Sequence, residues 1–398
     1  MSAYLFGNST AYPSLTVEIG IPSGTQGVWG GSVWGTGLWA DPTTVWADIS
    51  AYVRQVSTSW ERSRELNRQP ANVANLVLSN NDGRFTPGNL SGPYVVAGTS
   101  QIRPRVPLRI QATWNSTTYP VFYGVITNWQ DNLPGYGKDL VTSVTATDVG
   151  SQLALFAVDG ATIGTAASLP GSRIADILNT IFWPYGSSID TGTSTLQKDA
   201  TNDTAATLLQ HVADSDGGLW FVDRDGSLVY HDRDHRSTAT RSTATQITFG
   251  PSNTQYDEPQ LSQDDTLIFN TVNVTPEGLD TQSASDGDSI GLYSVRALDI
   301  GGWMTTTAEA ADLAAYWLAK YKDPEYRVDR VRVTPAYSAS AVWPLALDAQ
   351  IDDRHSVVVT IPGGGSITRA VHVSGISHSI TPDDGWRIVF GYSSATPY

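Results

Sequence analysis

The sequence predicts a mainly β protein of the α+β class, with two strand-rich parts and a smaller mixed α/β part between them. Three observations support this class. Short runs of β-branched and aromatic residues recur along the first 150 residues, separated by turns rich in Gly, Pro and Asn. Helical periodicity is present between residues 151 and 250. After residue 250 the strand pattern returns, and one amphipathic helix interrupts it.

The chain length sets the expected number of domains. At roughly 150 residues per domain, 398 residues correspond to two or three. We expect a first β domain with a Trp- and Gly-rich arm at 1–150, a small α/β domain at 151–250, and a second β domain at 251–398. No apolar run is long enough to predict a membrane span, and Met1–Thr10 lacks the features of a secretory signal.

In the first part, the spacing of strands and turns is typical of a barrel or a sandwich. The predicted strands are Val73–Ser79, Val106–Ala112, Tyr119–Trp129 and Leu140–Thr147.

The middle part combines two short helices with a hairpin. The first helix is expected at Ser172–Phe182 with Ser172 as its N-cap, and the second at Thr204–Ala213 with Asp203 as its N-cap. A hairpin follows, with its turn at Asp223–Gly226.

The last part is predicted to be β with one helix at Thr307–Tyr321. Thr306 and Glu309 fit a capping box at its start, and Pro324 prevents it from continuing. The predicted strands are Leu267–Val274, Val328–Thr334, His355–Ile361, Thr368–Ile376 and Trp386–Tyr392.

The charge is low in amount and uneven in distribution. Only 16% of residues are charged, against the usual ~25%, which favours a surface that faces other proteins. Residues 1–150 hold nine basic and nine acidic residues, whereas 151–398 hold fifteen and thirty. The window 251–312 carries eleven acids against the single basic residue Arg296. This balance argues against ordinary nucleic-acid binding, which needs a basic face.

No pattern indicates a catalytic centre, a cofactor or a metal site. The chain has no cysteine, which excludes disulfides and thiolate chemistry. His231 and His235 form the densest metal-like cluster, but on one strand they would lie about 13 Å apart, too far for one ion unless the chain turns. We therefore expect a polar strand end there, and we expect the chain not to be an enzyme.

Two groups of residues are candidates for subunit contacts. Trp29, Trp34 and Trp39 recur every five residues in a Gly-rich segment, either packing on the barrel or inserting into a neighbouring subunit. Arg62, Arg64, Arg68 and Arg84 are candidates for salt bridges between subunits, and a solvated strand face is the alternative.

Several blocks resemble a known kind of protein. In the first half these are Trp46–Trp60, Arg62–Arg68, Ala74–Pro87, Arg103–Ile110 and Tyr119–Ile126. Their order resembles the opening of minor tail proteins of tailed phages that infect actinobacteria. The later blocks Leu208–Ala213, Gly218–Leu228 and Thr307–Pro324 resemble the trimeric hub proteins of phage baseplates and tail tips.

This resemblance implies an architecture and partners. It implies two tube-type β-barrels per subunit and a homotrimer with a pseudo-six-fold ring, located at the virion tail tip after assembly in the host cytoplasm. The implied partners are the distal tail protein or tail tube, other tip or fibre proteins, the tape-measure protein, and DNA in transit, without stable membrane insertion. If the acidic window borders the channel, its acids would repel DNA. The candidates are Asp257, Glu258, Asp264, Asp265, Asp286 and Asp288.

Three alternatives remain open. The chain could be a distal tail protein that forms a hexameric ring. It could be a carbohydrate-binding adhesin, with Trp29, Trp34 and Trp39 stacking on sugars. A wall-cleaving hydrolase would need a carboxylate pair or a metal site, which the sequence does not single out.

Overall fold

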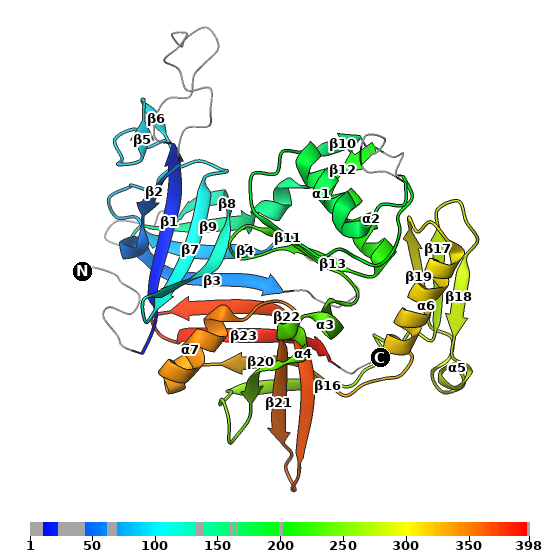
Figure 1. Ribbon diagram of the computed structural model, residues 1–398. Helices are drawn as coiled ribbons and strands as arrows, with labels where there is room; N and C mark the ends of the chain where they lie inside the picture. The colour runs from blue at the N-terminus through cyan, green and yellow to red at the C-terminus, as the bar shows by residue number, and fades with distance from the viewer. Residues whose placement is uncertain are drawn as a thin grey trace.

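The computed structural model describes residues 11–22, 44–61, 70–132, 139–159, 163, 166–198 and 202–395. A large sheet forms one part of the molecule, and two smaller bodies lie beside it (Figure 1). The prediction of a mainly β fold is confirmed. No helix in these ranges is long and apolar enough to span a membrane.

The large sheet has 13 strands and joins both ends of the chain. They are β1 (Ser14–Pro22), β2 (Thr44–Asp48), β3 (Val53–Glu61), β4 (Val73–Ser79), β7 (Pro107–Trp114), β8 (Thr117–Asn132), β9 (Val141–Asp148), β15 (Thr245–Phe249), β16 (Glu258–Ser262), β20 (Arg327–Val333), β21 (Arg354–Thr360), β22 (Ser366–Thr381) and β23 (Gly385–Ser394). The order is β16-β20-β23-β22-β3-β4-β9-β8-β7-β1-β2, with β21 paired to β22 and to β15. The antiparallel pairing of β3 with β22 connects the N-terminal strands to the C-terminal ones.

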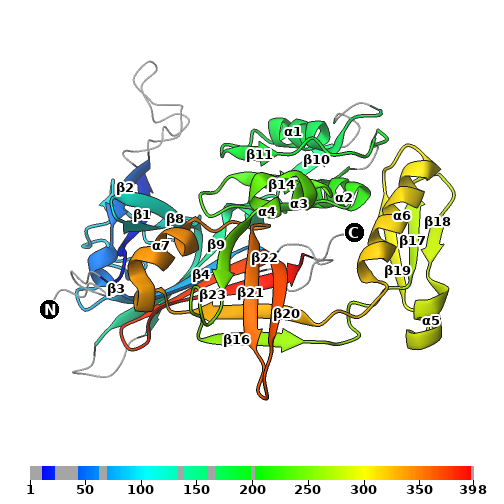
Figure 2. The same cartoon turned by 60° about the horizontal axis from the view of Figure 1, so that its bottom comes forward.

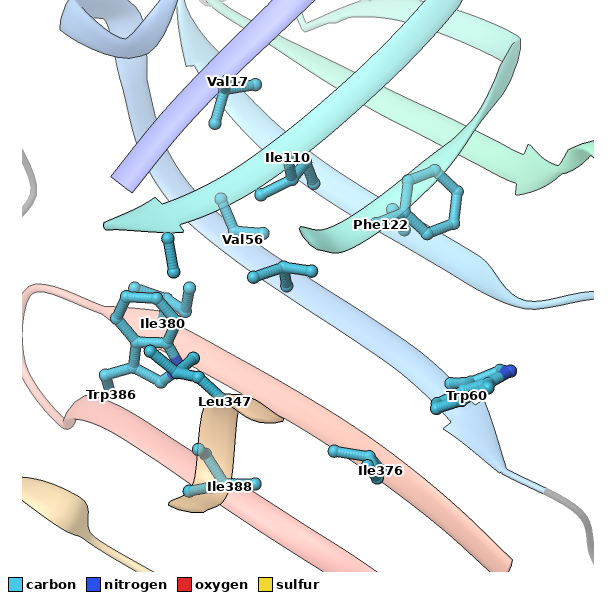
Figure 3. Close-up of a cluster of buried hydrophobic side chains, with 14 of the residues drawn as sticks. Val17, Val56, Trp60, Ile110, Phe122, Leu347, Ile376, Ile380, Trp386 and Ile388 are labelled. Carbon is cyan, nitrogen blue, oxygen red and sulfur yellow. The ribbon is translucent and has the colours of Figure 1, made fainter. Parts of the chain in front are cut away.

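The two groups of strands share one hydrophobic core (Figure 3). Alternation along β4 buries Ala74, Leu76 and Leu78, as expected for a sheet with one covered face. Figure 3 shows Val56 of β3 and Ile110 of β7 in the same cluster as side chains of β22 and β23. The limits of the predicted domains at 150 and 250 stay a prediction, but the strands on either side of them belong to one sheet.

Helix α7 (Ala339–Asp348), which the sequence pattern did not predict, covers part of this core. The sequence pattern did not predict this helix because Pro344 lies inside it, and proline normally ends a helix. Trp343 is fully buried, and its indole packs against Trp386 with 5.0 Å between ring centroids. Its Nε1 donates a hydrogen bond to the carbonyl of Ala11 at 2.9 Å, so α7 also holds the first described residues.

The second body, called the insertion here, comprises the described residues between 153 and 244 and has its own core. Its elements are β10 (Ala157–Asp159), β11 (Ser187–Ile189), β12 (Asn202–Thr204), β13 (Leu219–Val222), β14 (Leu228–His231), α1 (Pro170–Thr180), α2 (Ala205–Asp216), α3 (His235–Thr238) and α4 (Thr240–Thr243). The predicted hairpin is confirmed as β13–β14. Both predicted N-caps are wrong. Helix α1 starts earlier than predicted, with Leu169 at the N-cap position and Pro170 as its first residue, because proline is favoured at the first helical position. Helix α2 has Thr204 as its N-cap, one residue after Asp203, and the Thr204 hydroxyl accepts a hydrogen bond from the backbone N–H of Thr207.

The third body, called the α6 body here, spans residues 267–321. It contains β17 (Thr271–Pro276), β18 (Gln282–Ser285), β19 (Ala297–Gly302), α5 (Gly287–Tyr293) and α6 (Thr307–Tyr321). The predicted helix and its capping box between Thr306 and Glu309 are confirmed. Helix α6 packs on this three-stranded sheet, apart from the large sheet (Figure 2). A minor hairpin of β5 (Val95–Val96) and β6 (Thr99–Ser100) completes the β structure of the described residues.

Gly124→Ala is expected to destabilise the protein by about 2 kcal/mol. A Cβ at Gly124 in β8 would overlap the carbonyl oxygen of Thr147 and lie 2.8 Å from Cζ of Phe122. Gly291→Ala in α5 is the matched control, because a Cβ there meets nothing within 4 Å, and Ala is the better helix former by ~1 kcal/mol. Urea denaturation of both variants tests this. Equal midpoints for the two would contradict it.

Candidate functional site

The insertion is fastened to the large sheet by a buried group of charges, called the charged junction here. It comprises His231, Arg224, Arg236 and Arg241 from the insertion, Asp348 at the end of α7, and Asp352 and Asp353 from the segment between α7 and β21.

Asp352 is the centre of the junction. Its side chain is only 3% exposed and accepts hydrogen bonds from Nε of Arg236 and Nδ1 of His231, both at 2.8 Å. The residue has a positive φ of 67°, which aspartate tolerates better than most residues. Burial acts to raise the pKa of Asp352, but the Arg236 guanidinium and His231 outweigh it and hold that pKa well below its usual range. The carboxylate therefore stays ionised at neutral pH.

Arg241 forms the second ion pair of the junction. Its Nη2 lies 2.6 Å from Oδ2 of the buried Asp353, and its Nη1 lies 2.8 Å from Oδ2 of the more exposed Asp348. The hydrogen bonds that Arg241 donates to Asp353 are the main reason that its pKa is raised. This bidentate arrangement orients the α3–α4 segment against the start of β21.

Arg224 comes from the β13–β14 turn and is 7% exposed. Its Nη1 donates to the carbonyl of Leu347 at 3.0 Å and its Nη2 to that of Ala349 at 2.8 Å. These carbonyls are at the C-terminal end of α7, where helix carbonyls lack partners and carry partial negative charge. The insertion therefore caps a helix of the sheet body. Just before the β13–β14 turn, the carbonyl of Val222 accepts hydrogen bonds from Nε1 of Trp60 and Nδ2 of Asn72.

The His231–His235 segment differs from its prediction. Strand β14 ends at His231 and α3 begins at His235, so the chain turns and the two rings stack with centroids 3.5 Å apart. The separation expected on one continuous strand therefore does not apply, and β14 ends at His231, in line with the predicted polar strand end. Each Nδ1 is hydrogen-bonded to a carboxylate, that of His231 to Asp352 and that of His235 to Asp190. Within the described ranges, no group of three or more His, Cys, Asp or Glu side chains is placed to hold a metal ion.

A small pocket opens beside the junction, where the insertion meets α6. It is lined by Gly217, Gly218, Leu219, His231, Asp232, Arg233, Arg236, Tyr316, Trp317, Lys320 and Asp352. Its volume is about 40 Å³, enough for a few water molecules. The charged groups of the junction, which have fixed partners across the boundary between the insertion and the large sheet, thus attach these two parts to each other.

The predicted subunit-contact residues are only partly described. Trp29, Trp34, Trp39, Arg62, Arg64 and Arg68 lie outside the described residues. Arg84 is described. Its guanidinium lies 2.6 Å from Asp82 and 3.8 Å above the ring centroid of Tyr52. These contacts are within the chain, and a salt bridge from Arg84 to another subunit stays a prediction.

The predicted channel acids are largely neutralised within the chain. Glu258 pairs with Arg332 at 3.0 Å, Asp264 with Arg327 at 2.9 Å, Asp286 with Lys322 at 2.9 Å, and Asp265 with Arg296. Asp257 accepts a hydrogen bond from Thr334, and Asp288 lies in the first turn of α5. Their local field is therefore weaker than a count of acids suggests. Their position at a channel stays a prediction.

Sequence reasoning missed the residues of the junction. The Asp223–Gly226 turn was predicted correctly, but nothing in it distinguishes a buried Arg224 from an exposed one. The pair Asp352–Asp353 stands before a strand with no spacing that links it to Arg236 or Arg241, more than a hundred residues earlier.

Solved structures with similar folds are phage tail proteins. The 43 kDa tail protein of prophage MuSo2 from Shewanella oneidensis superposes with a TM-score of 0.58 at 15% identity, covering 96% of this chain and 97% of that one. The chain has the fold of a phage tail protein. The tail protein from Neisseria meningitidis MC58 gives a TM-score of 0.56 at 12% identity, covering 96% of both chains. Prophage tail protein gp18 from Listeria monocytogenes gives 0.50 at 10% identity, covering 96% of this chain and 95% of that one. No protein-family model matches the sequence, and no curated protein is significantly similar to it.

Buried histidines in the C-terminal strands of this tail-protein fold make its stability depend on pH. Burial lowers the pKa of His355 and His378 to about 3, whereas an unfolded histidine titrates near ~6.5. Their contribution is fully present above pH ~6.5 and is lost as the pH falls below it. Asp148 opposes this, because burial raises its pKa to about 6 and its protonation favours the native state.

Between pH 8 and pH 5 we expect His355, His378 and Asp148 together to lower the stability by about 2 to 3 kcal/mol. The raised pKa values of His235 and Asp223 act against this loss. Urea denaturation across this range measures it. His378→Gln is expected to remove about half of the loss due to the two histidines. A stability that stays constant or rises toward pH 5 would contradict the expectation.

Proposed function

We propose that the chain is a structural subunit of a phage tail, a hub at the tail tip that joins the tail tube or distal tail ring to the tip proteins. The observation that carries this proposal is the fold, which matches those of two phage tail proteins over nearly the whole length of both chains. In this proposal, three copies form a pseudo-six-fold ring of tube-like barrels around a channel for the tape-measure protein and DNA.

The structure supports a mechanical role through its connections. The large sheet joins strands from both ends of the chain through β3 and β22. The insertion is clamped to it by the buried ion pairs of Asp352 and Asp353. These contacts oppose hinging at the junction, because a hinge motion there would break several directional, charge-assisted hydrogen bonds together. The proposal assigns the chain no catalytic step and no cofactor.

Imaging of the purified chain tests this function. Class averages from electron microscopy are expected to show three-fold rings with a central opening. Six-fold rings would identify a distal tail ring instead. Monomers at all concentrations, also after addition of the tube and distal tail proteins, would contradict the hub and favour the adhesin.

The position of the acids is tested in the same particles. The proposal places Asp257, Glu258, Asp264, Asp265, Asp286 and Asp288 toward the channel. A reconstruction that places them on the outer wall would overturn that part alone.

A further inference from the structure

Four aromatic side chains form a continuous row on the surface, called the aromatic strip here. Trp46 of β2 contacts Tyr123 of β8 at 6.1 Å between ring centroids, Tyr123 contacts Tyr185 at 5.7 Å, and Tyr185 contacts Trp183 at 4.9 Å. All four are partly exposed. The row crosses from the edge strand β2 to the loop that follows α1 in the insertion.

Phe182 extends the strip at a cost to the monomer. Its side chain is 87% exposed, and its backbone has a left-handed φ of 51° at the end of α1. A bulky residue in this conformation is strained, and glycine or asparagine usually occupies such a position. Leu155 is 71% exposed and follows shortly after Gln152, whose side chain is hydrogen-bonded to Tyr185. Neither the strain nor the exposed apolar surface stabilises the single chain, which points to a contact with another one.

Arginines border the strip. The guanidinium of Arg109 lies 4.3 Å above the ring of Trp46 and pairs with Glu18. Arg103 and Arg105 are exposed, and neither forms an ion pair with any residue in the described ranges. The backbone N–H of Arg105 donates a hydrogen bond to the carbonyl of Ile126 in β8, three residues from Tyr123 of the strip. Trp, Tyr, Phe and Arg together are the residues enriched at protein interfaces.

A complementary surface is present on the α6 body. Leu292 in the last turn of helix α5 and Val295 just after the helix are 74% and 66% exposed. Glu277 and Asp280 are exposed on the same body. It therefore offers apolar side chains beside acids, as the strip offers apolar side chains beside unpaired arginines. In both views β2 and the α6 body lie at opposite ends of the molecule (Figures 1 and 2).

We propose that the aromatic strip of one copy binds the α5 surface of a second copy. This inference rests on the proposed homotrimer and names its contact. Because the two surfaces are different, the contact is heterologous, and heterologous contacts build a ring when the rotation between copies closes. The arginines and acids orient the encounter, and Phe182 and its aromatic neighbours supply the buried apolar area.

Site-directed cross-linking tests the contact. The chain has no cysteine, so Phe182→Cys carries a single thiol for a benzophenone maleimide. Labelled protein is mixed with an isotope-labelled copy, irradiated and digested. Cross-links are expected from position 182 of one copy to residues 286–299 of the other. Leu90→Cys, at a position that is 64% exposed, is the matched control and is expected not to link there.

Charge exchange supplies an independent measurement. Arg105→Glu is expected to weaken assembly about tenfold in sedimentation equilibrium without lowering the unfolding temperature, and Asp280→Arg in the same chain is expected to restore it. If rings form but the position-182 links map elsewhere and Arg105→Glu has no effect, this contact is wrong and the proposed hub stands. If the unmodified chain never associates, the contact and the homotrimer fail together.

Discussion

Arg224→Ala is expected to lower the free energy of unfolding by about 3 kcal/mol, the range for removing a buried charged hydrogen-bonding group. The guanidinium donates to the carbonyls of Leu347 and Ala349, and the variant leaves both without that donor. The guanidinium carbon also lies over the ring of Trp60, 5.5 Å from its centroid, a cation–π contact that the variant loses. Urea denaturation measures the loss.

The part of the structure that Arg224→Ala loosens is a second test of this role. Hydrogen exchange in α7 and in the β13–β14 hairpin is expected to increase together, because Arg224 connects them. Arg224→Lys is expected to recover only part of the stability, since an ammonium group does not reproduce the fork of two donors. Arg387→Ala is the matched control. Its partner Asp384 is 3.0 Å away but both side chains are exposed, so we expect less than about 0.5 kcal/mol. Equal losses in Arg224→Ala and Arg387→Ala would contradict the role of Arg224.

Asp352→Asn is the second large change, with an expected loss of about 3 kcal/mol. The substitution keeps the shape and the tolerance for a positive φ but removes the charge that faces Arg236 and His231. Arg236, whose side chain is 15% exposed, then lies beside a neutral amide. Asp348→Asn is the control, because that carboxylate is 54% exposed and Arg241 keeps its bond to Asp353. We expect the control to lose less than about 1 kcal/mol.

The pH dependence of Asp352→Asn distinguishes lost charge from lost packing. The folded-state pKa of Asp352 is depressed, so its contribution is present above the unfolded pKa of ~3.9 and is lost as the pH falls below that value. The difference between Asp352→Asn and the unmodified protein is therefore expected to be constant from pH 5 to pH 8 and to shrink in stronger acid. A difference that persists unchanged at pH 3 would indicate a packing effect alone.

Local sequence signals predicted local structure well. The capping box of Thr306 and Glu309 gave the start of α6, and Pro324 gave its limit, because both act within one turn of the helix. Strand β4 was predicted with its observed bounds from alternation alone. The two helices of the insertion were found, but their N-caps were misplaced, and α7 was missed because Pro344 is tolerated inside it.

The candidate site was predicted much less well. The sequence analysis drew attention to His231 and His235 as a polar strand end, whereas the structure stacks their rings and gives each its own carboxylate. Arg224, Asp352 and the aromatic strip had no signal at all. Their contact partners lie far away along the chain, and a single sequence does not show which distant residues meet in the folded structure.

The sequence alone was sufficient for the mainly β class, for helix α6 and the β13–β14 hairpin, for the excess of acid in the second half, and for the resemblance to phage tail proteins. These features follow from periodicity and helix capping, which depend on residues a few positions apart, and from composition, which is a count of residues. Folding in three dimensions was needed to pair β3 with β22, to place Arg224 at the end of α7, and to align Trp46, Tyr123, Tyr185 and Trp183 in one row. Each of these depends on burial and contact between segments distant in the chain, and those energies exist only once the strands and the insertion have packed together.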